Sequence, residues 1–125
     1  MGLKVMVLED DESIRSTLTA FLQKQGYEVL PFSRPDQCSF YHSNKCSCVI
    51  GSHCTDIILT DVNMPGQDGI GFIEDQIAKG CRVSRIAVMS GDWQSDAMKK
   101  AESLGCKIFH KPFSILSLKD WLEGL

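Results

Sequence analysis

Polar side chains stand at four points of the sequence where a short apolar run ends. They are Glu9 and Asp10, Asp61, Ser90 and Lys111. The three carboxylates would raise one another's pKa if they lay close together, because like charges disfavour ionisation. A hard divalent cation relieves this repulsion, and Mg²⁺ typically binds one or two carboxylates while keeping waters or a phosphate. These residue types therefore suit a magnesium site that handles a phosphoryl group.

The other roles follow from charge. A carboxylate attacks a phosphoryl group poorly because both are anionic, and Mg²⁺ together with Lys111 would offset that repulsion. Aspartyl phosphates are established covalent intermediates, so Asp61 could be the nucleophile. Ser90 could donate a hydrogen bond to a phosphoryl oxygen, and the main-chain carbonyl of Asn63 could be another metal ligand. Each residue also has an ordinary explanation, as a loop residue, a helix cap, a surface lysine or a solvated acidic turn.

The elements that must position these groups can be predicted from the apolar pattern. The apolar runs are short and nearly continuous, as expected for strands that are buried on both faces. We predict strands at 3–8, at 29–30 closed by Pro31, at 57–61, at 86–89 and at 107–109. We predict helices from the N-cap Ser13 to Gly26, at about 36–41, from 70 to Gly80, from 97 to Gly105, and from the N-cap Ser114 to 122.

Five alternations of strand and helix predict an α/β fold. Such alternation implies a parallel sheet with right-handed crossovers and helices on both faces. At 125 residues the chain is too small for an eight-fold barrel. The carboxyl ends of parallel strands share one edge, where open α/β sheets bind ligands. We therefore expect the polar groups at the strand ends to meet in one crevice.

Four motifs, taken together and in order, resemble a known family. They are Val7-Leu8-Glu9-Asp10, the Asp-x-x-Met-Pro-x-x-Asp-Gly pattern of 61–69, Met89-Ser90-Gly91 and Lys111-Pro112-Phe113. Over essentially its full length the chain resembles the receiver domain of two-component response regulators, and the chemotaxis-type regulators in particular. The resemblance implies a doubly wound five-stranded parallel sheet, flavodoxin-like (βα)5 with strand order 2-1-3-4-5, as a single receiver domain over 1–125.

The resemblance also implies a function. Asp61 would accept a phosphoryl group from a histidine kinase or a phosphotransfer protein, with Mg²⁺ held by Asp10 and Asp61. Glu9 would act mostly through metal-bound water, and Asn63 through its main-chain carbonyl. The phosphorylated domain would dock a downstream effector through the face of the fourth helix, the fifth strand and the fifth helix. Self-phosphorylation and autodephosphorylation would be its only chemistry, so we expect no turnover of an external substrate.

Two features bear on how such a domain would work. Three residues before Lys111 the family has an aromatic side chain that follows the hydroxyl inward on phosphorylation, whereas this chain has Ile108. Either Ile108 rearranges differently, which we favour, or its neighbour Phe109 takes the role through a shifted strand. Asn63 and Asp92 flank the phosphorylation site as in chemotaxis-type regulators, where such residues can assist the hydrolytic water. We therefore predict a short-lived acyl phosphate.

A cysteine-rich segment before the third predicted strand is several residues longer than in the family. It contains Cys38, His42, Cys46, Cys48, His53 and Cys54. Four of these side chains could bind zinc, yet the Cys-x-Cys spacing is not the usual Cys-x₂-Cys pair and a definite second pair is lacking. We expect free thiols, with a metal site and a disulfide or redox role as alternatives.

The composition excludes several classes of protein. A net charge of −3 argues against direct nucleic-acid binding. No apolar run approaches the ~20 residues of a membrane helix. The six cysteines occur without a secretory signal, so we expect free thiols in the cytoplasm.

Three other functions fit the sequence less well than a receiver domain. A pseudo-receiver interaction module, with a metal- or redox-sensing cysteine loop, would have lost an acid or the lysine, and all are present. A phosphohydrolase would carry a second acid two residues after Asp61, where Asn63 stands, and usually a cap domain. A flavodoxin would need a Ser/Thr/Gly-rich phosphate loop after the first strand, where the sequence is acidic. The sequence allows a stand-alone receiver and an excised domain alike.

Overall fold

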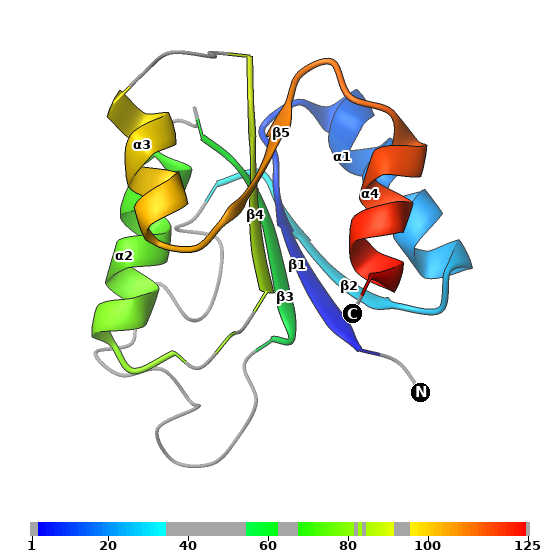
Figure 1. Ribbon diagram of the computed structural model, residues 1–125. Coiled ribbons are helices and arrows are strands. Elements are labelled where there is room, and N and C mark those ends of the chain that lie inside the picture. The colour runs from blue at the N-terminus through cyan, green and yellow to red at the C-terminus, as the bar shows by residue number, and fades with distance from the viewer. Residues whose placement is uncertain are drawn as a thin grey trace.

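A computed structural model describes residues 3–34, 55–62, 68–81, 83, 85–91 and 96–124. The elements are β1 (Lys4–Leu8), α1 (Glu12–Lys24), β2 (Glu28–Phe32), β3 (Ile57–Asp61), α2 (Gly69–Ala78), β4 (Arg85–Ser90), α3 (Asp96–Ser103), β5 (Lys107–His110) and α4 (Ile115–Glu123). The strands form one parallel sheet in the order β2-β1-β3-β4-β5. Helices α1 and α4 cover one face and α2 and α3 the other (Figure 1). The predicted doubly wound, flavodoxin-like fold is confirmed.

Both faces of the sheet are buried, which explains the unbroken apolar runs. Along β1, Val5 and Val7 face the core formed with α1 and α4. Met6 and Leu8 point to the opposite face, where they pack with Phe72 of α2. Because successive side chains of a strand alternate between faces, a strand covered on both sides needs apolar residues at every position.

Three of the predicted helix boundaries rest on caps that the structure confirms. Gly26 and Gly80 follow α1 and α2 with positive φ angles of 95° and 89°, which glycine adopts without steric cost. The side chain of Ser114 accepts a hydrogen bond from the backbone N–H of Ser117 at 3.1 Å and caps α4.

The predicted N-cap of the first helix is wrong. The cap is Asp11, whose side chain accepts a hydrogen bond from the backbone N–H of Ile14 at 3.1 Å, so Ser13 lies inside the first turn. Asp and Ser are about equally good N-caps. The choice follows from the preceding turn, in which the backbone N–H of Asp11 donates to Glu9 Oε1 at 3.2 Å.

Pro31 does not close the second strand, contrary to prediction. It lies inside β2, opposite Val7 of β1. Among the described strands, β2 is at the edge of the sheet and pairs only with β1. An edge strand tolerates proline because one of its sides makes no hydrogen bonds to a neighbouring strand.

Some predictions concern residues outside the described ranges. These are the helix at about 36–41 and the cysteine-rich segment. Within the described ranges, none of the helices combines the length and the apolar character that a membrane crossing requires.

Candidate functional site

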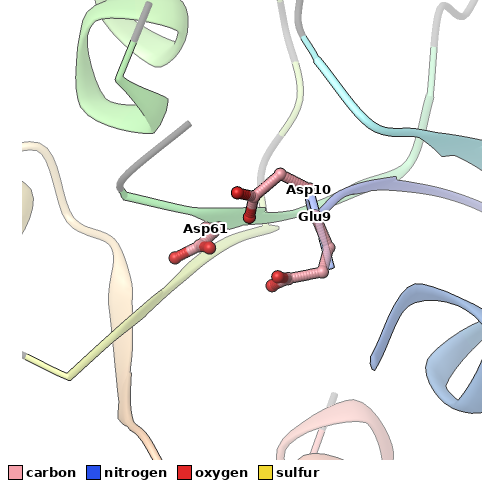
Figure 2. A group of neighbouring side chains, drawn as sticks. All are labelled: Glu9, Asp10 and Asp61. Carbon is pink, nitrogen blue, oxygen red and sulfur yellow. The ribbon is translucent and has the colours of Figure 1, made fainter. Parts of the chain in front are cut away.

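Three carboxylates meet at the carboxyl edge of the sheet. Glu9 and Asp10 form the turn after β1, and Asp61 is the last residue of β3, which pairs with β1. One carboxylate oxygen of each residue lies within 4.8 Å of those of the other two (Figure 2). The acids predicted from the strand ends therefore do come together, although Asp61 is about 50 residues from the other two in the chain.

Burial differs among the three acids. Glu9 is 1% exposed and Asp61 is 6% exposed. Asp10 is exposed to solvent. The group is therefore accessible from the side of Asp10, while the other two carboxylates are largely withdrawn from water.

Lys111 links the two buried acids. Its Nζ donates hydrogen bonds to Glu9 Oε2 at 3.0 Å and to Asp61 Oδ2 at 3.2 Å. Lys111 directly follows β5, and its backbone N–H donates to the carbonyl of Ser90 at 2.7 Å. Ser90 is the last residue of β4 and is 1% exposed. The structure thus brings Glu9, Asp10, Asp61 and Lys111 into one group, with Ser90 beside it.

The pKa values of the two buried acids are raised. Burial is the largest cause for both. The hydrogen bond from Lys111 lowers the pKa of Glu9, and its charge lowers that of Asp61, without cancelling the effect of burial. Repulsion from a neighbouring acid adds to the rise, from Asp61 on Glu9 and from Asp10 on Asp61. For Lys111 itself, burial lowers the pKa, but Glu9 and Asp61 raise it by more.

The donor atoms and the charge of this group suit a metal ion. The donor atoms are all carboxylate oxygens, which Mg²⁺ prefers. Burial and repulsion from a neighbouring acid raise the pKa values of Glu9 and Asp61 despite the nearby Lys111 ammonium, so a further positive charge would favour their ionised forms. A hard divalent cation would supply that charge, and the three converging carboxylate oxygens fit Mg²⁺.

The first residue of α2, Gly69, packs closely against the main chain of Asp61. This contact was not predicted from the sequence. A Cβ on Gly69 would lie 2.1 Å from the main-chain oxygen of Asp61 and 2.8 Å from Thr60 Oγ1. The Thr60 hydroxyl is buried and donates to the same Asp61 oxygen at 3.0 Å. The signal in the sequence was the glycine that ends the Asp-x-x-Met-Pro-x-x-Asp-Gly pattern.

Ile108 and Phe109, the two candidates for the aromatic switch, lie on opposite faces of the sheet. Phe109 is 4% exposed and packs with Phe113 and edge-on with Trp121, at ring-centroid distances of 5.1 and 5.9 Å. Ile108 packs against the core on the other face, which includes Met98 of α3. Which of the two responds to phosphorylation stays a prediction.

Three further predictions fall on residues outside the described ranges. The main-chain role of Asn63, the role of Asp92 in hydrolysis and the chemistry of the cysteine-rich segment all stay predictions.

Residues 5–123 match the family model of the response regulator receiver domain. Two bacterial relatives are the transcriptional regulatory protein PdtaR of Mycobacterium tuberculosis strain H37Rv, 29% identical over 121 residues, and the sporulation initiation phosphotransferase F of Bacillus subtilis, 26% identical over 123 residues. Each alignment covers 96% of this chain, with 55% of PdtaR and 90% of the phosphotransferase. The chain therefore spans about half the length of PdtaR.

Solved structures share the fold. The chemotaxis protein CheY4 of Vibrio cholerae superposes with a TM-score of 0.77 at 22% sequence identity, and the match covers 99% of this chain and 98% of CheY4. At this identity the likeness concerns the fold alone.

Proposed function

Since the chain belongs to the family of response regulator receiver domains, we propose that it accepts a phosphoryl group on Asp61 from the phosphohistidine of a histidine kinase or a phosphotransfer protein. One observation carries this proposal: the buried Asp61 carboxylate lies at the centre of a group that holds two further acids and the Lys111 ammonium. We also propose that residues 1–125 act as one domain.

In the transfer step, an Asp61 carboxylate oxygen forms the new O–P bond while the N–P bond of the phosphohistidine breaks. The imidazole leaves after taking up a proton. Both reacting groups are anionic, so the step needs positive charge close to Asp61. Lys111 is 3.2 Å from Asp61 Oδ2, and on phosphorylation its ammonium would pair with the phosphoryl oxygens while keeping its bond to Glu9.

The remaining positive charge would come from Mg²⁺, held by Asp10 and Asp61, by Glu9 through water and by the carbonyl of Asn63. When bound, the ion offsets the repulsion between the Asp61 carboxylate and the incoming phosphoryl group. The hydroxyl of Ser90, at the end of β4, would donate to a phosphoryl oxygen. These assignments rest on the converging strand ends and on the chemistry of the donor set.

The output surface is proposed to be the face of α3, β5 and α4, which are the fourth helix, fifth strand and fifth helix of the predicted alternation. Lys111 connects this face to the site, because it directly follows β5 and its Nζ contacts Glu9 and Asp61. A movement of Lys111 on phosphorylation would be transmitted to the loop between β5 and α4. The partner would be an effector protein rather than a nucleic acid, in keeping with the net charge of −3.

Labelling with radioactive acetyl phosphate tests the proposal. The wild-type protein should be labelled in Mg²⁺ and not in EDTA, and Asp61→Asn should not be labelled. Asp120→Asn is a matched control, since it removes a carboxylate from the exposed side of α4 and should label as the wild type does. Equal labelling of Asp61→Asn and the wild type would refute the assignment.

The lifetime of the label tests the part assigned to Asn63 and Asp92. The acyl phosphate should be lost quickly in native buffer, because such residues can assist the hydrolytic water. A label that persists for many hours would contradict this. The chemistry proposed for the protein ends with this hydrolysis, and no external substrate is turned over.

A further inference from the structure

The first turn of α1 makes hydrogen bonds to Glu9, the residue that follows β1. The guanidinium of Arg15 donates from Nη1 to the carbonyl oxygen of Glu9 at 2.9 Å. The backbone N–H of Asp11 donates to Glu9 Oε1 at 3.2 Å, and the backbone N–H of Arg15 donates to the carbonyl of Asp11 at 2.9 Å. The main chain and the side chain of Glu9 are therefore both tied to the start of this helix.

The other polar atoms of Glu9 are held by different elements. Its backbone N–H donates to the carbonyl of Phe32 in β2 at 3.1 Å, and its Oε2 accepts from Lys111. Glu9 is thus fixed by β2, by the loop after β5 and by α1. Its carbonyl, however, lies beyond the last paired residue of β1, which is Leu8. Arg15 supplies the donor that this carbonyl needs at the end of the ladder.

This bond bears directly on Asp10. The carbonyl of Glu9 and the N–H of Asp10 belong to one rigid peptide plane. A charged donor makes a hydrogen bond about twice as strong as a neutral one, so the guanidinium fixes that plane firmly. The plane in turn sets the direction in which the exposed Asp10 side chain leaves the backbone, toward Asp61.

We propose that Arg15 is a positioning residue of the metal site, which orients the Glu9–Asp10 turn so that its carboxylates converge with Asp61. The inference rests on the proposed function, because it assumes that Mg²⁺ binds there. Arg15 does not itself contact the ion. It acts through the main chain of Glu9, in the way that groups behind metal ligands commonly orient them.

The sign of the effect separates positioning from simple electrostatics. A cation near the site repels Mg²⁺, so removing it should tighten binding if charge alone matters. If Arg15 positions the turn, removing it should weaken binding. Loss of a group that orients metal ligands typically costs 10- to 100-fold in affinity, and we expect about a 10-fold higher Kd for Arg15→Met.

The experiment is a Mg²⁺ titration of phosphodonor-free protein by isothermal titration calorimetry. Arg15→Lys keeps the charge and one donor, so it should bind Mg²⁺ with an affinity between those of the wild type and Arg15→Met. The matched control is Lys24→Met, which removes a positive charge from the exposed last turn of the same helix and should bind as the wild type does. Unfolding curves in EDTA establish that each variant is folded.

Equal or tighter binding by folded Arg15→Met would overturn the inference. If Arg15→Met does not fold, Arg15→Lys decides, and wild-type affinity in that variant together with unchanged amide resonances of Asp10 and Asp11 would also overturn it. A wild-type protein that binds no Mg²⁺ would instead refute the proposed metal site itself. The two failures are therefore distinguishable.

Discussion

Asp61 occupies an environment that disfavours its own charge. It is 6% exposed, and burial raises its pKa despite the ammonium of Lys111 at 3.2 Å. A group with this property reduces the stability of the folded protein when it is ionised. The residue proposed to react is therefore held in place by the rest of the fold at some cost in stability.

The pH dependence of stability follows from these shifts. The folded protein binds protons at Glu9 and Asp61 more tightly than the unfolded chain, because burial raises both pKa values. The stability contributed by these two acids should therefore rise as the pH falls from neutral through their folded-state pKa values. Lys111 keeps its proton throughout this range, because Glu9 and Asp61 raise its pKa above the ordinary value.

The measurement is the Tm in EDTA at a series of pH values for the wild type and Asp61→Asn. The variant should have the higher Tm at neutral pH, and the difference should shrink as the pH is lowered. A lower Tm for Asp61→Asn at neutral pH would contradict the conclusion that ionised Asp61 destabilises the folded protein.

At the scale of the element, helix α2 begins directly against the main chain of Asp61. Gly69→Ala would place a methyl group 2.1 Å from the Asp61 oxygen, so the start of α2 or the end of β3 must move. Overpacking of this kind costs about 1–3 kcal/mol. We expect urea unfolding to show this loss, and acetyl phosphate labelling to be slower.

Gly91→Ala is the matched control for this substitution. Gly91 follows β4 at the same edge of the sheet, and a Cβ built there meets no atom of the described residues within 4 Å. Its stability should stay close to that of the wild type. If the two variants lose the same stability, the contact between Gly69 and Asp61 is not the cause.

Helix α2 also carries a buried amide. Gln76 is 1% exposed, and neither its Nε2 nor its Oε1 has a hydrogen-bond partner among the described residues. An unsatisfied buried polar group costs about 1–3 kcal/mol, and an apolar side chain of the same shape removes that cost. Gln76→Met should therefore raise the free energy of unfolding by an amount of this order.

Urea unfolding measures this effect as well. Gln23→Met on the exposed side of α1 serves as the control and should change stability little. A clear loss of stability in Gln76→Met would mean that the amide has a partner outside the described ranges.

At the scale of the whole molecule, Mg²⁺ should stabilise the fold. An ion that binds only the folded state adds about 2.7 kcal/mol when its concentration is 100 times its Kd. The Tm of the wild type should thus rise with Mg²⁺, and that of Asp61→Asn should rise much less, because a ligand is lost. Equal increases for both proteins would place the ion elsewhere.

The sequence predicted the fold and the meeting of the acids for a simple reason. Strands buried on both faces have unbroken apolar runs, and parallel strands end at one edge, so Asp61 and Lys111 could be placed without coordinates. The N-cap of α1 was predicted wrongly because it depends on a hydrogen bond to the preceding turn. Asp11 and Ser13 are both good caps, and only the bond from Asp11 to Glu9 decides between them.

Other features of the site could not be predicted because they depend on distances between segments. The crowding of Gly69 against Asp61 requires knowing where α2 begins relative to β3. The bond from Arg15 to Glu9 requires knowing how α1 leaves β1. The place of Pro31 within β2 depends on that strand being at the edge, which no local pattern reveals.

Pro31 has a consequence for how the folded protein behaves at high concentration. The edge strands of a sheet can pair with a strand of another molecule, and this pairing leads to aggregation. On the β2 edge, Pro31 has no N–H group, so the row of donors that an added strand would need is interrupted. Residues 107–110 of β5 contain no proline. Proline therefore discourages strand addition at the β2 edge, whereas at the β5 edge, beside the proposed docking face, that protection would have to come from the shortness of the strand and from Lys107.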